Sequence, residues 1–144
     1  MQNLKDLTWD VNEWHDADGK RHISFSLNMY VRAYVRQTRG TRYRSDNHGK
    51  YARQYIECQN ALKDTFRLVM DLNKFEPFGK QPIGCAINVF GPMAHRSDLS
   101  NLEKAVEDAA NGQVWHDDRW IYERGHGRKG KADNDLLELH VWEI

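Results

Sequence analysis

The residues with the most potential for chemistry are concentrated in one segment in the second half of the chain. They are four carboxylates, an amide and a lysine: Asp98, Asn101, Lys104, Asp108, Asp117 and Asp118. Hard cations such as Mg²⁺ prefer carboxylate oxygens, usually one or two of them together with water and phosphate oxygens. A nearby lysine offsets the negative charge that develops on a phosphate group during cleavage. The segment therefore indicates metal-assisted phosphate chemistry.

A helix is the element expected to carry the first part of this segment. Asn101, Lys104 and Asp108 are three and four residues apart, and this spacing puts their side chains on one helical face. Asp117 and Asp118 follow after a short turn, where the chain can fold back toward the start of the helix. The two groups of polar residues are therefore expected to meet.

Helix construction is an alternative explanation for part of this polarity. Ser100 and Glu103 match a capping box, in which the two side chains bind each other's backbone amides, and Asp98 is an alternative N-cap. The pair Asn111-Gly112 is typical of a helix end. On this alternative, the protein is an unrelated α+β domain whose polar helix is only well capped.

The remaining sequence predicts a small set of strands and helices around this segment. Residues 22–30 alternate apolar and polar side chains, which is typical of a half-buried strand. Residues 50–72 repeat apolar side chains every three or four positions, which predicts a long helix. Further strands are predicted at residues 83–91, 119–123 and 136–144. This order predicts a single α+β domain, in which a mixed β-sheet of about four strands carries two main helices packed on one face.

The first residues of the chain are expected to form a separate feature. We assign residues 1–21 to an N-terminal extension and residues 22–144 to the domain. Asp18-Gly19 stands before the first predicted strand and favours a hairpin turn. An appendage that covers part of the core explains this extension as well as a functional role does.

The composition points to a globular protein without a membrane partner. Hydrophobic residues make up 40% and charged residues 29% of the 144-residue chain, which argues against disorder. The two cysteines, Cys58 and Cys85, form no CxxC pair and are expected to be reduced, with a disulfide as the alternative. Apolar runs stay below the roughly 18 residues of a membrane-spanning helix, and no signal-peptide pattern opens the sequence. We therefore expect a cytoplasmic protein.

Positive charge is concentrated in residues 30–53, although the formal net charge of the chain is zero. Seven lysines and arginines are interleaved there with four tyrosines, and Asp46 is the one acid. Basic and aromatic side chains in one segment are typical of a nucleic-acid contact surface, and a solvated loop is the alternative. The candidate contacts to a nucleic-acid backbone are Arg39, Arg42, Arg44 and Lys50.

These motifs together resemble the RusA family of Holliday-junction resolvases, small endodeoxyribonucleases typical of bacteria and their phages. The family pattern runs D-x-D-N-x-x-K, then an Asp, then D-D before a strand. Here residues 98–104 read D-L-S-N-L-E-K, Asp108 follows, and residues 115–118 read W-H-D-D. The order of strands, basic loop and helices extends the resemblance over residues 22–144.

The resemblance implies an activity and a set of site residues. The implied protein is a Mg²⁺-dependent endodeoxyribonuclease, with Mn²⁺ as an alternative ion, that cuts four-way branched DNA in recombination and repair. Paired cuts call for a homodimer, because a two-fold axis then relates two sites. The family's catalytic positions fall on Asp98, Asn101, Lys104 and Asp118, and its metal ligands on Asp98 and Asp118 with Asp117 in support. A bacterial or phage-encoded protein is implied.

One position departs from the family pattern. Ser100 stands where the motif has its second acid, and an uncharged hydroxyl binds Mg²⁺ poorly. Asp108, Asp117 or a water molecule is then expected to complete the site, or the site binds metal weakly. The alternative function is a protein that binds branched DNA and cuts it weakly or not at all.

Overall fold

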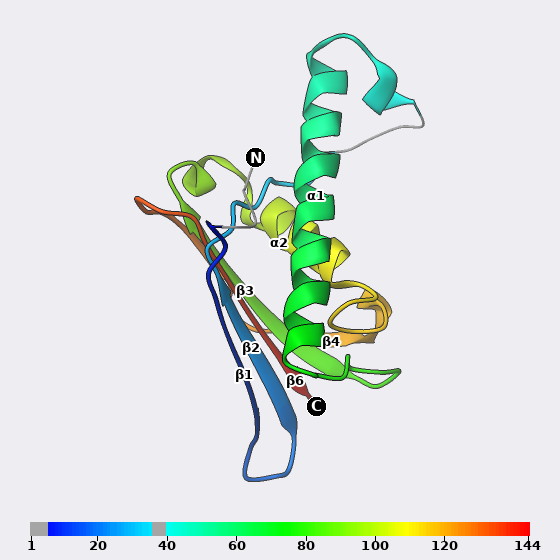
Figure 1. The fold of residues 1–144 in the computed structure, drawn as a ribbon, viewed down its shortest axis with the longest axis vertical. Coiled ribbons are helices and arrows are strands. Elements are labelled where there is room, and N and C mark those ends of the chain that lie inside the picture. The colour runs from blue at the N-terminus through cyan, green and yellow to red at the C-terminus, as the bar shows by residue number, and fades with distance from the viewer. Residues whose placement is uncertain (1–5, 36–39) are drawn as a thin grey trace.

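A mixed sheet of six strands forms one layer of the protein in the computed structural model, which describes residues 6–35 and 40–144 (Figure 1). The strands are Trp9–His15 (β1), Arg21–Leu27 (β2), Ile83–Gly91 (β3), Ile121–Arg124 (β4), Arg128–Lys131 (β5) and Leu136–Glu143 (β6). Their order is β1-β2-β6-β3-β4, and β5 also pairs with β3. The pairs β1·β2, β2·β6 and β6·β3 are antiparallel, whereas β4 and β5 run parallel to β3.

This sheet confirms the predicted α+β class, with six strands where the sequence indicated about four. One additional strand is β1, which pairs with β2 in the hairpin that Asp18-Gly19 indicated. Gly19 has the positive φ of 79° that favours glycine in such a turn. The other additional strand is β5, a short basic segment that pairs with β3 through its backbone.

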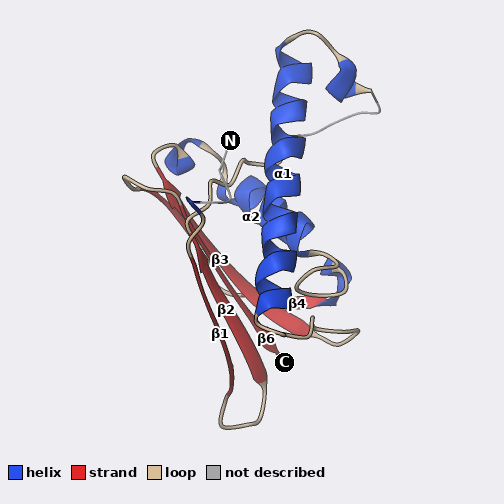
Figure 2. Ribbon diagram, viewed as in Figure 1, coloured by secondary structure: helices blue, strands red, loops and turns tan. Residues whose placement is uncertain are grey.

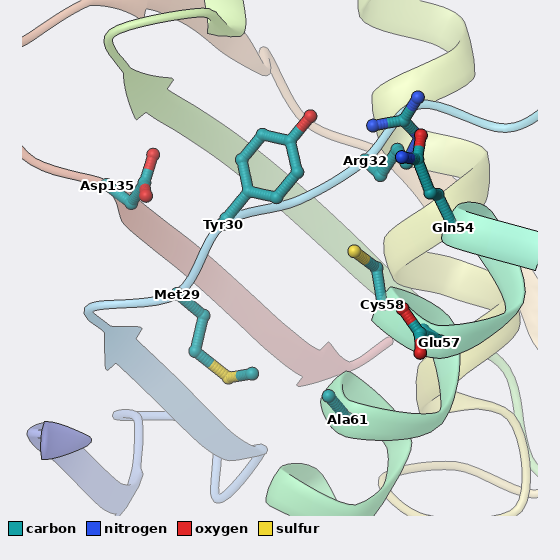
Figure 3. Close-up of a pocket in the computed structure, with 8 residues that line it drawn as sticks. All are labelled: Met29, Tyr30, Arg32, Gln54, Glu57, Cys58, Ala61 and Asp135. Carbon is teal, nitrogen blue, oxygen red and sulfur yellow. The ribbon is translucent and has the colours of Figure 1, made fainter. Parts of the chain in front are cut away.

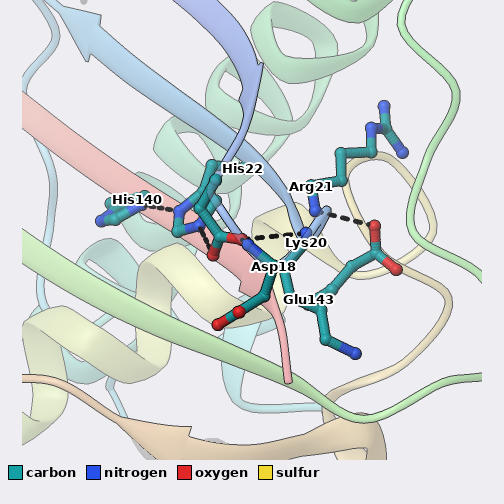
Figure 4. Close-up of polar contacts among 7 residues, drawn as sticks. Asp18, Lys20, Arg21, His22, His140 and Glu143 are labelled. Carbon is teal, nitrogen blue, oxygen red and sulfur yellow. Dashed lines mark hydrogen bonds and ion pairs between the residues drawn. The ribbon is translucent and has the colours of Figure 1, made fainter.

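Polar contacts connect the hairpin to β6 (Figure 4). The backbone amide of Arg21 donates to Glu143 Oε1 at 3.0 Å. His22 Nδ1 and His140 Nε2 are hydrogen-bonded at 2.9 Å, and His22 Nε2 bonds Asp16 Oδ2 at 2.9 Å. The N-terminal strand is therefore an integral part of the sheet edge.

Both long helices lie on the same face of the sheet (Figure 2). The first, α1 (Asn47–Leu72), begins earlier than predicted because the Asp46 carboxylate accepts a hydrogen bond from the Gly49 amide at 3.2 Å. Its N-terminal turns extend beyond the sheet, where the short 3₁₀ helix η2 (Thr41–Tyr43) also lies (Figure 1). The second, α2 (Leu99–Ala110), packs beside α1. Across the described residues, no helix combines the length and the apolar character needed to span a membrane.

The core lies between the sheet and these helices. Alternate side chains of β2 and β6 are buried there, which confirms the predicted period of two: Ile23, Phe25, Leu27, Leu137, Leu139 and Val141. Phe66 of α1 meets Phe25 edge to face, with ring centroids 5.4 Å apart. Cys85 is buried and Cys58 half-buried, and both are free thiols, as expected.

The start of α2 contradicts the capping-box hypothesis. Asp98 is the N-cap residue in an extended conformation, and its carbonyl oxygen accepts a hydrogen bond from the Asn101 amide at 3.1 Å. Ser100 therefore lies inside the first turn instead of at the cap. The predicted end of the helix is confirmed, because Asn111 is the C-cap and Gly112 has a φ of 79°.

The strand predicted at residues 119–123 begins later in the structure. A 3₁₀ turn, η4 (Asp118–Trp120), comes first, and the Trp120 amide donates to the Asp117 carbonyl oxygen at 3.1 Å. β4 then starts at Ile121 on the edge of the sheet. Asp118 is consequently held on a tight turn immediately before β4.

Candidate active site

Side chains of α2, η4 and β4 line a pocket of about 340 Å³, which we call the α2 pocket. Its lining residues are Ser100, Glu103, Lys104, Glu107, Asp118 and Arg124. The four from α2 recur at three- and four-residue spacing, so they form one stripe of the helix. β4 pairs with β3 so that Arg124 lies opposite Cys85, and this pairing brings Arg124 to the stripe. The pocket gathers three carboxylates, two cationic groups and a hydroxyl.

A bidentate ion pair forms one wall of the α2 pocket. Arg124 Nε and Nη2 donate to the two carboxylate oxygens of Glu107 at 2.9 and 2.7 Å. Glu107 is only 6% exposed, and a carboxylate in such a place needs a cationic partner. The hydrogen bonds and the charge of Glu107 raise the pKa of Arg124. The guanidinium therefore remains a permanent cation in the pocket.

Glu103 lies one helical turn before Glu107 on the same stripe. Burial raises the pKa of Glu103, and the negative charge of Glu107 raises it further. The loop after β4 closes against this side chain at Gly127. A Cβ at that position would lie 3.2 Å from Glu103 Oε2 and 2.5 Å from the Ile87 carbonyl oxygen, so a larger residue would push the loop away.

The adjacent acids Asp117 and Asp118 have opposite electrostatic environments. The neighbouring Asp117 carboxyl is the main cause that raises the pKa of Asp118; burial and the charges of Asp108 and Glu107 add to it. The pKa of Asp117 is lowered by its hydrogen bond with Asp118 and by Arg119, whose Nε donates to Asp117 Oδ2 at 3.1 Å. Asp117 is therefore the more stable anion of the pair.

Lys104 lies at the border between the α2 pocket and a second group of residues. Its Nζ atom is 3.7 Å from Asp108 Oδ2 and 4.8 Å from the centre of the Tyr34 ring. The Tyr34 amide donates to the Asn101 carbonyl oxygen at 3.0 Å, which ties the extended segment before η2 to α2. The lysine side chain is half exposed, so its ammonium group is accessible to an anion.

The structure places two of the residues predicted from the sequence in the α2 pocket. Lys104 and Asp118 line the α2 pocket together with Ser100. Asp98 lies at the N-cap with an exposed carboxylate, which accepts no capping hydrogen bond from the described turn. Asn101 and Asp108 belong to the neighbouring stripe of α2, on the side of Tyr34 and Tyr55, and Asp117 lies beside the pocket. The roles assigned to all these residues stay predictions.

Three lining residues were missed by the sequence analysis: Glu103, Glu107 and Arg124. Glu103 was assigned to a capping box, which hid its place one turn after Ser100. Glu107 shares that stripe, and the i, i+4 spacing of the two glutamates is the signal that would have identified them. The pairing with Arg124 joins residues 17 positions apart through the fold and left no local signal.

Two carboxylates of the α2 pocket are candidate metal ligands. Within residues 6–35 and 40–144, no three His, Cys, Asp or Glu side chains are grouped so that they would hold a metal by themselves. Glu107 is occupied by Arg124, whereas Asp118 and Glu103 form no ion pair among the described residues. Since Mg²⁺ usually takes one or two carboxylates with water and phosphate oxygens, these two hard-oxygen donors fit an ion that also binds a phosphate.

The described members of the predicted DNA-binding set lie in η2, immediately after it and in the first turn of α1. Arg42, Lys50 and Arg53 line a shallow hollow there. Arg53 Nη1 donates to the carbonyl oxygens of Arg42 and Arg44 at 2.8 and 2.7 Å, which fixes η2 against α1. The Arg44 side chain is paired with Asp46. Arg39, the remaining candidate, lies outside the described residues.

A comparison with protein families gives one match. The family described as Endodeoxyribonuclease RusA matches residues 28–136, which is most of the chain. The match includes both long helices and every residue that lines the α2 pocket. A comparison with curated proteins found no significant match.

Proposed function

The chain belongs to the RusA family of endodeoxyribonucleases, and from this membership we propose that it resolves four-way DNA junctions in a Mg²⁺-dependent reaction. The observation that carries the proposal is the α2 pocket, where Lys104 and Asp118 meet from two separate parts of the motif. Ser100 lines the same pocket, at the position of the second motif acid. The proposed substrate is branched DNA in recombination and repair.

Asp118 and Glu103 are the proposed ligands of the metal ion. A Mg²⁺ ion at these carboxylates would supply an activated water molecule and polarise the scissile phosphate, with Mn²⁺ as an alternative ion. The family motif has its second acid at the position of Ser100. Glu103, one helical turn later, offers the pocket a carboxylate in its place. The exposed carboxylate of Asp98 is a further oxygen donor at the start of α2, and Asp117, the more stable anion of its pair, is an additional proposed ligand beside Asp118.

Lys104 is the proposed electrostatic catalyst. Its ammonium group is accessible, and it is held by an ion pair of 3.7 Å that is weak enough to yield to a phosphate. A cation at this point stabilises the negative charge that grows on the phosphate oxygens during cleavage. The backbone carbonyl oxygen of Asn101 accepts the Tyr34 amide, a bond that any residue at this position would make. The catalytic role proposed for the Asn101 side chain rests on its place in the family motif.

A homodimer and a basic DNA-contact surface complete the proposal. Two related cuts in a four-way junction need two active sites, which a two-fold axis supplies. The proposed backbone contacts are Arg39, Arg42, Arg44 and Lys50. Arg42 and Lys50 share a hollow with Arg53 and one acid, Glu57, so three positive charges outweigh one negative charge there. The proposed cellular site is the cytoplasm of a bacterium or of a phage-infected cell.

A second candidate function is branched-DNA binding without cleavage. Ser100 favours it, because the pocket lacks one motif acid. The Arg124–Glu107 pair also favours it, since a guanidinium already neutralises one of the three carboxylates in the pocket. On this account, the protein binds branched DNA and cuts it weakly or not at all.

Incubation of the purified protein with a labelled four-way junction separates the two functions. The nuclease proposal predicts paired cuts in Mg²⁺ or Mn²⁺, no cuts in EDTA, and little cutting of the matching duplex. Ser100→Asp is expected to raise the cleavage rate, because it returns an acid to the pocket. Salt-sensitive junction binding with no nicking in either metal would favour the second function.

A further inference from the structure

A second hollow of about 380 Å³ lies next to Lys104, and we call it the tyrosine groove. It runs between the extended segment 30–35, the first turns of α1 and the loop that follows β3. Its walls include Tyr30, Tyr34, Tyr51, Arg32, Arg96 and Met93. The volume is at the lower end of the roughly 300–1,000 Å³ typical of small-ligand pockets, which suits a single nucleobase with its phosphate.

The charge of the tyrosine groove is purely positive. None of the described residues that line it is an acid, whereas two are arginines. Arg32 Nε is buried and has no hydrogen-bond acceptor among the described residues. A phosphate oxygen in the groove would give the Arg32 guanidinium an anionic partner, because a guanidinium offers several donors in a fixed plane.

Two aromatic side chains and a methionine are exposed in the same groove. Tyr30, Tyr51 and Met93 are 36%, 45% and 47% exposed. The guanidinium of Arg32 lies 5.8 Å from the centre of the Tyr51 ring, so a cation is already near an aromatic face. Aromatic rings beside arginines form the kind of surface on which unpaired bases stack.

The tyrosine groove continues into the α2 pocket. Tyr34 lines the groove, and its ring lies 4.8 Å from the Lys104 ammonium group that lines the pocket. The Tyr34 amide is bonded to α2 at Asn101, so the wall between the two hollows is fixed. A DNA strand with one phosphate at Lys104 would therefore have its next nucleotides at the groove.

The adjoining hollow on the other side of the extended segment has a different character (Figure 3). Tyr30 and Arg32 belong to both hollows, but this one also contains Glu57, Asp135 and the half-buried Cys58. Its two acids would repel a phosphate. A nucleic-acid strand is thus favoured on the α2 side of Tyr30 and Arg32.

We infer that the tyrosine groove binds an unpaired nucleotide of the DNA strand that enters the α2 pocket. In a duplex both faces of each base are covered by neighbours, so a tyrosine stacks only on a base that has left the stack. The exchange point of a junction is where bases are least covered. This inference rests on the proposed function for its ligand, DNA, and it adds a subsite that selects branched over continuous duplex.

Binding of a short fluorescein-labelled oligothymidylate to the full-length protein tests the groove. The assay is anisotropy in EDTA, so it requires neither metal nor cleavage. Tyr30→Ala and Tyr51→Ala are each expected to weaken binding by roughly tenfold, and Tyr51→Phe to retain it. Tyr122→Ala is the matched control, because Tyr122 is 66% exposed on β4 and lies outside the groove. Arg96→Gln is expected to reduce the salt slope of binding by about 0.7.

The outcomes of this assay and of the junction-cleavage assay are independent. Equal oligothymidylate affinity of the wild type and both alanine variants overturns the groove, even if the protein cuts junctions. A loss in Tyr122→Ala as large as in the groove variants also overturns it, as does a wild type that does not bind the oligonucleotide. Loss confined to the groove variants, in a protein that does not nick junctions, supports the groove and refutes the nuclease.

Discussion

Arg124 is the residue that gives the α2 pocket its electrostatic balance. It makes two hydrogen bonds to the buried Glu107 carboxylate and lies near Glu103. Without it, two glutamates one turn apart would repel each other in a partly desolvated site. The arginine therefore allows acids to be close enough together for metal chemistry while keeping one of them neutralised.

Replacement of Arg124 by Met is expected to lower the free energy of unfolding by about 2 kcal/mol. This value lies between the roughly 0–1 kcal/mol of an exposed ion pair and the 3–5 kcal/mol lost when a fully buried pair is broken, because Arg124 itself is half exposed. Urea denaturation measures the change. Arg67→Met is the control, since its pair with Asp64 is exposed on α1. If Arg124→Met and Arg67→Met lost equal stability, the burial of Glu107 would not add to the cost of losing its arginine partner, contrary to this account.

At the scale of the element, the two helices begin in different ways. The N-cap of α1 is a side-chain cap, because Asp46 accepts a hydrogen bond from the Gly49 amide. The N-cap of α2 is Asp98, whose carboxylate is exposed and makes no such bond within the described turn. The Asp98 carboxylate is therefore available to a ligand at the start of α2.

This difference predicts unequal costs for two alanine substitutions. Asp46→Ala is expected to lower the free energy of unfolding, because the capping hydrogen bond from the Gly49 amide is lost. Asp98→Ala is expected to cost less, because no capping hydrogen bond is lost, yet to reduce junction cleavage. Chemical denaturation and the cleavage assay measure the two effects. A stability loss in Asp98→Ala as large as in Asp46→Ala would show that Asp98 acts as a structural cap.

At the scale of the whole molecule, the two long helices α1 and α2 lie on one face of the sheet (Figure 2). On the other face, aromatic rings from three strands stack across the sheet. Trp14, His22 and His140 have centroids 5.0 to 5.4 Å apart, and Trp142 adjoins His140 at 4.9 Å. Trp142 also covers Gly84, where an added Cβ would lie 2.3 Å from its ring. This stack holds the N-terminal hairpin on the sheet.

The stack predicts a loss of stability at acidic pH. Burial lowers the pKa of His140 from 6.5, and the neighbouring His22 lowers it further, so the unfolded chain takes up a proton more readily than the folded one. Stability should therefore fall as pH drops below about 6.5. Urea denaturation at pH 7.5 and 5.5 is expected to show this fall, and His140→Phe to reduce it. The assignment to His140 would be contradicted if His140→Phe lost as much stability between pH 7.5 and 5.5 as the wild type. It would also be contradicted if the exposed control His116→Phe reduced this loss by as much as His140→Phe.

The elements whose burial alternates along the chain were predictable from the sequence. β2 and β6 each bury every second residue, and α1 repeats apolar residues at helical spacing, so these patterns are local. β5 was not predictable, because Arg-Lys-Gly-Lys joins the sheet through its backbone and buries little. The α2 pocket was predicted only in part. Ser100 and Glu103 belong to the stripe of α2 that lines the pocket, whereas Asn101 and Asp108 belong to the adjacent stripe. Which of the two stripes faces η4 and β4 depends on how α2 packs, and the local sequence does not contain that information.

The cleavage rate of a labelled four-way junction by Asp118→Asn is the most direct test of the α2 pocket as a nuclease site. The wild type is expected to cut the junction in Mg²⁺. Asp118→Asn is expected to bind it with similar affinity and to cut it at least about 100-fold more slowly, because a carboxamide cannot replace the anionic ligand. Asp133→Asn, an exposed substitution outside the pocket, is the control and should cut normally. Cleavage by Asp118→Asn at the wild-type rate would contradict the account.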